Sequence, residues 1–137
     1  MNEDQRFAFT PEDGVALYYD WERMRATALE PLRSGKPAVF RPYDWETGRL
    51  ADCTVLIESH PIVIVEGLFV SRPELSDLVE YAILVESPAE LRAERQAIRH
   101  DASEGWLDRW ERAESWFFGQ VRRPSEFNLV VVGDERP

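Results

Sequence analysis

The sequence has only one lysine and one cysteine among its 137 residues. Fifteen of the 16 Lys and Arg residues are arginine, and Lys36 is followed by a proline, so no G-x-x-x-x-G-K-[ST] sequence is present. In many nucleotide-binding enzymes that sequence forms the loop whose backbone N–H groups and lysine hold the phosphates. Cys53, being alone, cannot form an internal disulfide, so a reducing compartment is the expected environment.

Positive charge is also scarce. There are 26 Asp and Glu residues against 16 Lys and Arg, and the formal net charge is -10. Such a charge repels nucleic acids and acidic membrane surfaces. The sequence has no basic-then-apolar leader and no apolar stretch near bilayer length. We therefore expect a cytoplasmic protein with no nucleic acid and no membrane as its partner. The two histidines have no partner at zinc-ligand spacing, so a zinc site is not expected.

The length and the hydrophobic content of 44% allow one core, and we expect a single domain over residues 1–137. Helical spacing of apolar residues predicts a helix that begins after Asp20 and ends at Gly35. A second helix is predicted from 87–88, and a third from Ser103 with one continuous apolar face.

Three apolar, β-branched runs have the pattern of strands that are buried on both faces of a parallel sheet. They are residues 61–65, 81–85 and 129–132. Shorter strands are predicted at 38–41 and 53–57. Because strands alternate with helices, the sequence predicts an α/β layered fold.

Glu66 directly follows the run at 61–65, at the sheet edge where open α/β folds bind their ligands. A carboxylate there could hold a magnesium ion, directly or through water, and Gly67 would let a ligand approach closely. A strand that simply ends at a polar residue and a turn glycine would have the same sequence. Both interpretations stay open at this point.

Arg92, Arg95 and Arg99 recur at intervals of three and four, so they share one face of the predicted helix. Several guanidinium groups on one face suit a phosphate ligand. Glu90 and Glu94 lie among them, however, and a solvated helix with exposed ion pairs is an equally good interpretation.

Aromatic residues accompany carboxylates at two places. Tyr43 and Trp45 flank Asp44 in a segment that begins with proline, and Tyr19 precedes Asp20. Rings of this kind can stack on a base while a carboxylate binds a ribose diol. Aromatic residues near helix starts also serve as core or staple residues, which is the competing interpretation.

Five segments, taken in order, resemble the uridine kinase family. They are Tyr19-Asp20-Trp21, Pro42 through Arg49, Val63 through Gly67, Arg92 through Asp101, and Phe127 through Val131. The likeness covers about residues 15 to 133. It implies the three-layer core of a P-loop NTPase with a parallel sheet. It also implies transfer of the γ-phosphoryl group of ATP or another NTP, with Mg²⁺, to a nucleoside or similar small hydroxyl compound.

The same resemblance implies roles for eight residues. The substrate would be bound by Tyr19, Asp20, Tyr43, Trp45 and Arg92. Arg95 and Arg99 would belong to a phosphate-binding lid. Glu66 would take part in catalysis and hold magnesium, directly or through water.

The sequence departs from the family pattern at Glu46-Thr47-Gly48, where the family has a histidine that reads the base, and at His100, where it has an aspartate. The family's first strand, its P-loop and its Asp-Asp-Phe-Tyr segment would all precede residue 1. We therefore expect a kinase-like chain without its N-terminal strands and P-loop, which does not transfer phosphate unaided.

A missing strand would leave two buried sheet edges. These edges could pair directly, exchange segments with a second copy, or take the missing piece from another polypeptide, so a homo-oligomer formed through exposed sheet edges is one expectation. An alternative function is a non-enzymatic nucleoside-binding or dimerising module derived from the same fold. A third interpretation is an α/β domain whose resemblance to kinases is accidental.

Overall fold

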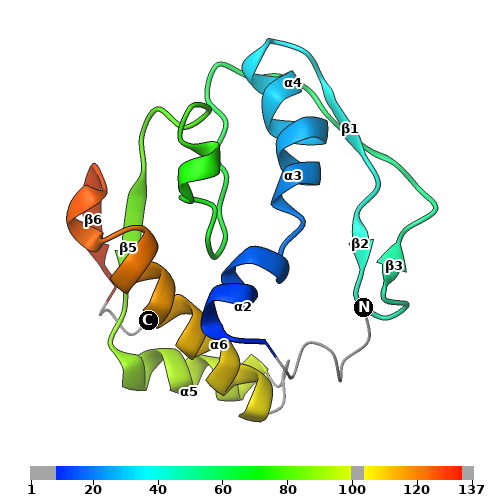
Figure 1. Cartoon of the computed structure of the whole chain (residues 1–137). Helices are drawn as coiled ribbons and strands as arrows, with labels where there is room; N and C mark the ends of the chain where they lie inside the picture. Colours follow the sequence, from blue (N-terminus) through cyan, green and yellow to red (C-terminus); the bar gives the residue numbers. More distant parts are fainter. Residues whose placement is uncertain (1–8, 100–103, 134–137) are drawn as a thin grey trace. The chain divides into compact units, whose positions relative to one another are not determined.

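The computed structural model describes residues 9–99 and 104–133. These residues belong to two compact units. The first unit contains the chain up to Tyr18 and from Ser71 onward, and the second unit is Tyr19–Val70. Helices and strands occur in both units, which confirms the predicted mixed α/β class (Figure 1). The single domain stays a prediction, and each unit is described by itself below.

The described residues form three sheets of two strands each. In the second unit β1 (Ala38–Phe40) pairs with β4 (Val55–Ile57), and β2 (Tyr43–Asp44) pairs with β3 (Arg49–Leu50); both pairs are antiparallel. In the first unit β5 (Ile83–Glu86) runs parallel to β6 (Leu129–Val132), with Ile83 opposite Leu129 (Figure 1). The parallel pairing of the runs at 81–85 and 129–132 is thus confirmed. Their predicted burial on both faces is wrong: all four side chains of β6 are exposed, and Leu84 is the one buried residue of β5, because no further strand or helix layer covers both faces of this two-stranded sheet within the described residues.

The prediction of a buried parallel strand at 61–65 is wrong. The structure assigns no strand to these residues, and the side chains of Ile62 and Ile64 are 79% and 86% exposed. An apolar run supplies side chains suited to a sheet interior, but a strand also needs a neighbouring backbone with which to exchange hydrogen bonds. Within the described residues, no strand pairs with this segment.

The helix predicted from Asp20 to Gly35 is confirmed, with an irregular middle. It consists of α3 (Trp21–Met24), the π-helical segment η1 (Arg25–Leu29) and α4 (Glu30–Arg33). The carboxylate of Asp20 caps it by accepting a hydrogen bond from the backbone N–H of Arg23 at 3.1 Å. Gly35 ends it in the left-handed conformation, with φ of 72°.

Helices of the first unit also follow the sequence signals. In α2 (Pro11–Leu17) the Thr10 hydroxyl accepts from the backbone N–H of Asp13, and the Asp13 carboxylate accepts in return from the backbone N–H of Thr10. The helices predicted from 87–88 and from Ser103 correspond to α5 (Ala89–Arg99) and α6 (Glu104–Trp116). Ser103 itself lies outside the described residues. The π-helical segment η3 (Phe117–Val121) extends α6.

The core of the first unit lies along the apolar face of α6 and η3, as predicted. Ala113 and Phe117 are completely buried, and Leu75 of the 3₁₀ segment η2 (Pro73–Leu75) is almost so. The α2 helix packs against α6, where the ring of Tyr18 lies 4.8 Å from that of Trp110. Gly14 permits this contact, since a Cβ atom there would lie 2.7 Å from the Tyr18 ring.

Arg72 is a buried cation in the first unit, only 4% exposed. Its Nε donates to the carboxylate of Glu74 at 3.1 Å, and its Nη1 donates to the carbonyl oxygen of Val15 at 3.5 Å. Arg122 donates to the carbonyl oxygen of Ser71 at 2.8 Å and lies over the ring of Phe127. Side chains therefore join segments of this unit that no strand pairing connects.

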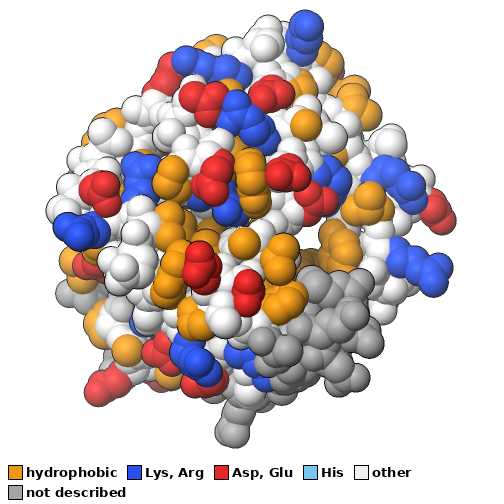
Figure 2. All heavy atoms as spheres, in the orientation of Figure 1, with side chains coloured by type: hydrophobic (Ala, Val, Ile, Leu, Met, Phe, Trp, Pro, Cys, Tyr) orange, Lys and Arg blue, Asp and Glu red, His pale blue; other side chains and the backbone are white. Residues whose placement is uncertain are grey.

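In the described part of the chain, no helix is both long enough and apolar enough to cross a membrane. On the face of the molecule shown in Figure 2, acidic and basic side chains are interspersed, with apolar side chains between them.

Replacing Phe117 by alanine removes a fully buried ring from the core of the first unit. We expect Phe117→Ala to lower the free energy of unfolding by about 3–5 kcal/mol, because the lost contacts leave a cavity. Phe118→Ala, at the half-buried neighbouring position, should cost clearly less. Urea unfolding followed by circular dichroism measures both, and equal losses would contradict the placement of this core.

The hydrogen bond from Arg72 lowers the pKa of the Glu74 carboxyl from its ordinary value of 4.5. A carboxyl whose pKa is lower in the folded state stabilises the fold above its unfolded pKa, and this contribution is lost as the pH falls through the folded pKa. Because Glu74 is partly exposed, solvent screening limits the effect, and we expect Glu74→Gln to destabilise by about 1 kcal/mol at pH 7. The difference from the native chain should shrink below pH 4.5. Glu111→Gln, which removes the same charge from an exposed site on α6, is the control; a Glu74→Gln effect that persists at low pH would disprove the ion-pair explanation.

Candidate functional site

The β2–β3 hairpin of the second unit carries the predicted base-binding segment. Its turn is formed by the Asp44 carboxylate, which accepts from the backbone N–H groups of Glu46 at 2.9 Å and Thr47 at 3.3 Å. Hydrogen bonds from the Thr47 hydroxyl and then from these N–H groups lower the pKa of Asp44. Gly48 completes the turn with φ of 67°, a conformation that favours glycine. Asp44 thus folds the hairpin, and it stays ionised at neutral pH.

The structure brings Tyr43 and Trp45 together, as the prediction requires. Their ring centroids lie 4.8 Å apart with an interplanar angle of 77°, an edge-to-face contact. Tyr43 is half-buried, whereas Trp45 is 73% exposed. A planar base could stack on the exposed indole while Tyr43 keeps the indole in place.

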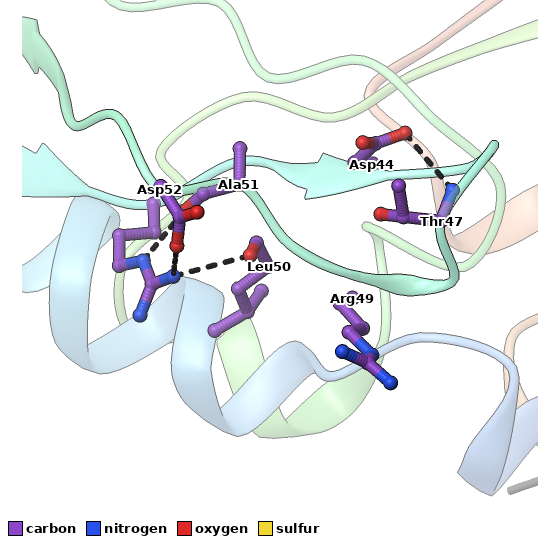
Figure 3. A pocket seen from close by; sticks show the side chains of 7 residues that line it. Asp44, Thr47, Arg49, Leu50, Ala51 and Asp52 are labelled. Atoms are coloured by element: carbon purple, nitrogen blue, oxygen red, sulfur yellow. Dashed lines mark hydrogen bonds and ion pairs between the residues drawn. The ribbon is translucent and has the colours of Figure 1, made fainter.

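A wide-open cavity of about 660 Å³ lies against this hairpin. Its lining residues are Arg41, Asp44, Thr47, Arg49, Leu50, Ala51 and Asp52 (Figure 3). The guanidinium of Arg41 donates to the carbonyl oxygens of Leu50 and Ala51 and to the carboxylate of Asp52. Arg49 extends away from Asp44 in Figure 3. Sequence reasoning missed Arg41, although an arginine immediately before the Pro42-Tyr43 segment could have suggested it.

Asp20 is connected to the hairpin through Arg23. The Nε of Arg23 donates to Oδ2 of Asp20 at 3.0 Å, and its Nη1 donates to the carbonyl oxygen of Arg41 at 3.0 Å. Asp20 therefore has two structural roles: it caps the helix, and it forms an ion pair with Arg23. Its side chain is 61% exposed, and each carboxylate oxygen has acceptor capacity beyond the one hydrogen bond that it accepts from Arg23.

A second aromatic contact of the same unit joins Tyr19 and Phe69. The rings of Tyr19 and Phe69 meet edge to face with centroids 6.3 Å apart. Burial raises the pKa of Tyr19, and the nearby negative charge of Glu66 raises it further. The negative charge of Glu66, which is itself exposed, thus acts on Tyr19, although the two residues were predicted separately from distant parts of the sequence.

The predicted arginine face lies on α5 in the first unit. Arg92 forms an ion pair with Glu114 of α6, with 3.3 Å between Nη1 and Oε1. Both residues line a cavity of about 450 Å³ at the carboxyl ends of β5 and β6. Arg95 is exposed. The side chain of Arg99 lies outside the described residues.

Within the described ranges, no group of three or more His, Cys, Asp and Glu side chains is placed to hold a metal ion. Glu66 would thus be a single carboxylate ligand. Magnesium is commonly bound in that way, by one or two carboxylates together with waters and substrate phosphates.

Comparison with known proteins shows similarity to uridine kinases. The chain is 28% identical over 148 aligned positions to the uridine kinase of Shewanella frigidimarina, and the alignment covers 96% of this chain and 69% of that enzyme. The chain is distantly similar to uridine kinases. It is also 33% identical over 72 residues to the uridine kinase of Macrococcus caseolyticus and 30% identical over 78 residues to that of Staphylococcus haemolyticus.

These two shorter matches cover 52% and 56% of this chain, and they span 35% and 38% of the two uridine kinases. No family model matches the sequence. The similarity to uridine kinases that the sequence segments suggested is confirmed.

Gly48 is the position at which the hairpin geometry can be tested. A side chain there would adopt an unfavourable left-handed conformation, and its Cβ atom would lie 3.8 Å from the Tyr43 hydroxyl. We expect Gly48→Ala to destabilise the chain by about 1–2 kcal/mol and to shift the fluorescence of the exposed Trp45. In Gly119→Ala the new methyl group meets nothing within 4 Å and lies in helical backbone, so this variant should be neutral or stabilising. Chemical denaturation and emission spectra compare the two, and equal behaviour would refute the described turn.

Proposed function

We propose that this chain is the nucleoside-binding part of a uridine kinase-like phosphotransferase, which phosphorylates a nucleoside or a similar small hydroxyl compound at the expense of an NTP. The observation that carries the proposal is the similarity to a uridine kinase along 96% of the chain. The proposal includes the fold: one domain of the P-loop NTPase type, completed by a phosphate-binding segment that is not among these 137 residues.

The β2–β3 hairpin supports the proposed binding of the nucleoside, which would accept the phosphoryl group. Trp45 presents an exposed ring that Tyr43 supports from its edge, and base stacking on such a ring tolerates more than one base. We propose that Asp20 binds ribose hydroxyl groups with the acceptor capacity that its carboxylate keeps beside the hydrogen bonds from Arg23. Arg92 is the proposed substrate-side arginine, and its ion pair with Glu114 fixes the direction of its guanidinium.

The proposed donor side, which would bind the NTP and its magnesium ion, consists of Glu66 and the arginines of α5. Glu66 is exposed, and an isolated exposed carboxylate fits a magnesium ion that keeps most of its waters and is shared with the NTP phosphates. Bound there, magnesium would neutralise charge that develops on the transferred phosphoryl group. Arg95 and Arg99 are the proposed phosphate-binding lid. Since the sequence contains no P-loop motif, we propose that the chain alone binds nucleoside without transferring phosphate.

A second candidate is a non-enzymatic nucleoside-binding or dimerising module. It is favoured by the apolar side chains that the parallel sheet leaves exposed, among them Ile83, Val85 and Val132. An exposed sheet of this kind is an unusual surface for a monomer and would suit a second copy of the chain. Sedimentation of the purified chain separates this candidate from a monomeric kinase fragment.

Isothermal titration with uridine, with cytidine and with ATP–magnesium tests the proposal. We expect a nucleoside to bind and ATP to bind poorly. Tyr43→Ala should weaken nucleoside binding about tenfold, because the loss of a stacking support costs on the order of 1–3 kcal/mol. Tyr81→Ala, at an exposed tyrosine of the first unit, is the matched control and should leave the affinity unchanged.

Two results would count against the proposal. Failure of both nucleosides to bind would remove the acceptor site. Micromolar binding of ATP would show a phosphate site other than a P-loop, and the division into acceptor and donor parts would then be wrong.

A further inference from the structure

The side chain of Arg23 connects two parts of the second unit that are distant in sequence. Its Nε donates to Oδ2 of Asp20 at 3.0 Å, and its Nη1 donates to the carbonyl oxygen of Arg41 at 3.0 Å. Asp20 is the N-cap of α3, and Arg41 lies between the end of β1 and the start of β2. One guanidinium group therefore binds both the start of the helix and the point at which the chain enters the β2–β3 hairpin.

The backbone of Arg23 is itself fixed in the first turns of the helix. Its N–H donates to Oδ1 of Asp20 at 3.1 Å, and its carbonyl oxygen accepts from the Thr27 hydroxyl at 2.8 Å. An isolated exposed ion pair contributes little to stability, but a planar guanidinium that serves two acceptors determines their relative direction. Both carboxylate oxygens of Asp20 are bound to the same residue, so this carboxylate is held in one orientation.

Arg41 extends the connection into the hairpin. Its guanidinium donates to the carbonyl oxygens of Leu50 and Ala51, at the end of β3. Leu50 lies opposite Tyr43 in the register of the two strands. Arg41 is thus bound at its carbonyl oxygen by Arg23, while its side chain binds the strand that pairs with Tyr43. A continuous series of hydrogen bonds runs from the start of the helix to the hairpin.

The two ends of this series carry the groups proposed for the two halves of a nucleoside. Each oxygen of the Asp20 carboxylate can accept one more hydrogen bond, which suits two neighbouring hydroxyl groups of a ribose. The hairpin presents the ring of Trp45, 73% exposed, for a base. Base and sugar are covalently joined, so the second contact strengthens binding only when the carboxylate and the ring are held at a matching separation.

We propose that Arg23 is a positioning residue that fixes the Asp20 carboxylate relative to the β2–β3 hairpin, so that the 2′- and 3′-hydroxyl groups and the base of one nucleoside bind together. This inference rests on the proposed function for its ligand. A lysine at position 23 would keep the positive charge beside Asp20, but its ammonium group could not hold both acceptors in fixed directions.

The experiment compares variants of the full chain that keep the start of the helix intact. Arg23→Lys keeps the charge without the planar fork, and Asp20→Ser removes the carboxylate but keeps a hydroxyl that caps helices. Arg33→Lys is the control, since it makes the same exchange at an exposed arginine at the other end of the helix. Isothermal titration uses uridine and 2′,3′-dideoxyuridine, which has the same base and lacks both hydroxyl groups.

We expect the native chain to bind uridine about tenfold more tightly than 2′,3′-dideoxyuridine, because the hydroxyl groups donate to a charged acceptor. Arg23→Lys and Asp20→Ser should each abolish this preference and leave the affinity for dideoxyuridine unchanged. The double variant should be no worse than Asp20→Ser alone, since the two residues act together. Arg33→Lys should retain the preference. A preference retained in Arg23→Lys, or an equal loss of affinity for both nucleosides, would overturn the positioning role.

A measurement without ligand tests the structural part. Spin labels on Glu22→Cys in α3 and Glu46→Cys in the hairpin turn, both at exposed positions, report the separation of helix and hairpin by electron paramagnetic resonance. The chain also carries Cys53→Ser, because Cys53 is exposed and would be labelled. Arg23→Lys should broaden the distribution of distances, and Arg33→Lys should not. An unchanged distribution in Arg23→Lys would overturn the positioning role alone.

The native chain separates this inference from the proposed function. If it binds neither nucleoside, the role of Arg23 in ligand binding is overturned together with the proposed function. If it binds both nucleosides equally well, binding of the base stands, and the joint binding of base and ribose through Arg23 is overturned.

Discussion

Arginine guanidinium groups bind backbone carbonyl oxygens at the points where segments distant in sequence meet. In the first unit Arg72 and Arg122 reach the carbonyl oxygens of Val15 and Ser71. In the second unit Arg23 binds the carbonyl oxygen of Arg41. The guanidinium of Arg41 in turn binds the carbonyl oxygens of Leu50 and Ala51. With only two strands in each sheet of the described residues, ladders satisfy few carbonyl groups. A planar group with five donors can serve two acceptors in fixed directions, which a lysine ammonium cannot do as well.

Local signals predicted the local structure well. Asp20 caps its helix through a side chain that reaches three residues ahead, and Gly35 ends it through a backbone conformation that only glycine adopts easily. The segment 61–65 shows where such reasoning stops. Its apolar, β-branched residues satisfy the local preference for a strand, but pairing depends on a neighbouring backbone that the segment itself does not specify.

The same distinction applies to the candidate site. Tyr43 and Trp45 are close in sequence and share one hairpin, so their association could be predicted. The contact of Tyr19 with Phe69, and that of Arg92 with Glu114, follow from packing between separate segments and have no local signal. The positive φ of Phe69, 63°, could not be predicted from the sequence either. Glycine or asparagine at a position indicates a left-handed backbone conformation, whereas phenylalanine does not.

Among the described residues, two helices contain a π-helical segment: η1 lies within the α3–α4 helix and η3 at the end of α6. A π-turn accommodates one extra residue in a helix whose ends stay in place. Loss of a single residue from η3, such as Gly119, would therefore let the helix continue as regular α-helix while the residues that follow keep their direction. Arg122 would then keep its direction, and with it the hydrogen bond to Ser71. In this chain a one-residue gap in an alignment near residue 119 would therefore mark a relative whose helix is regular at this place and whose C-terminal strand is unchanged.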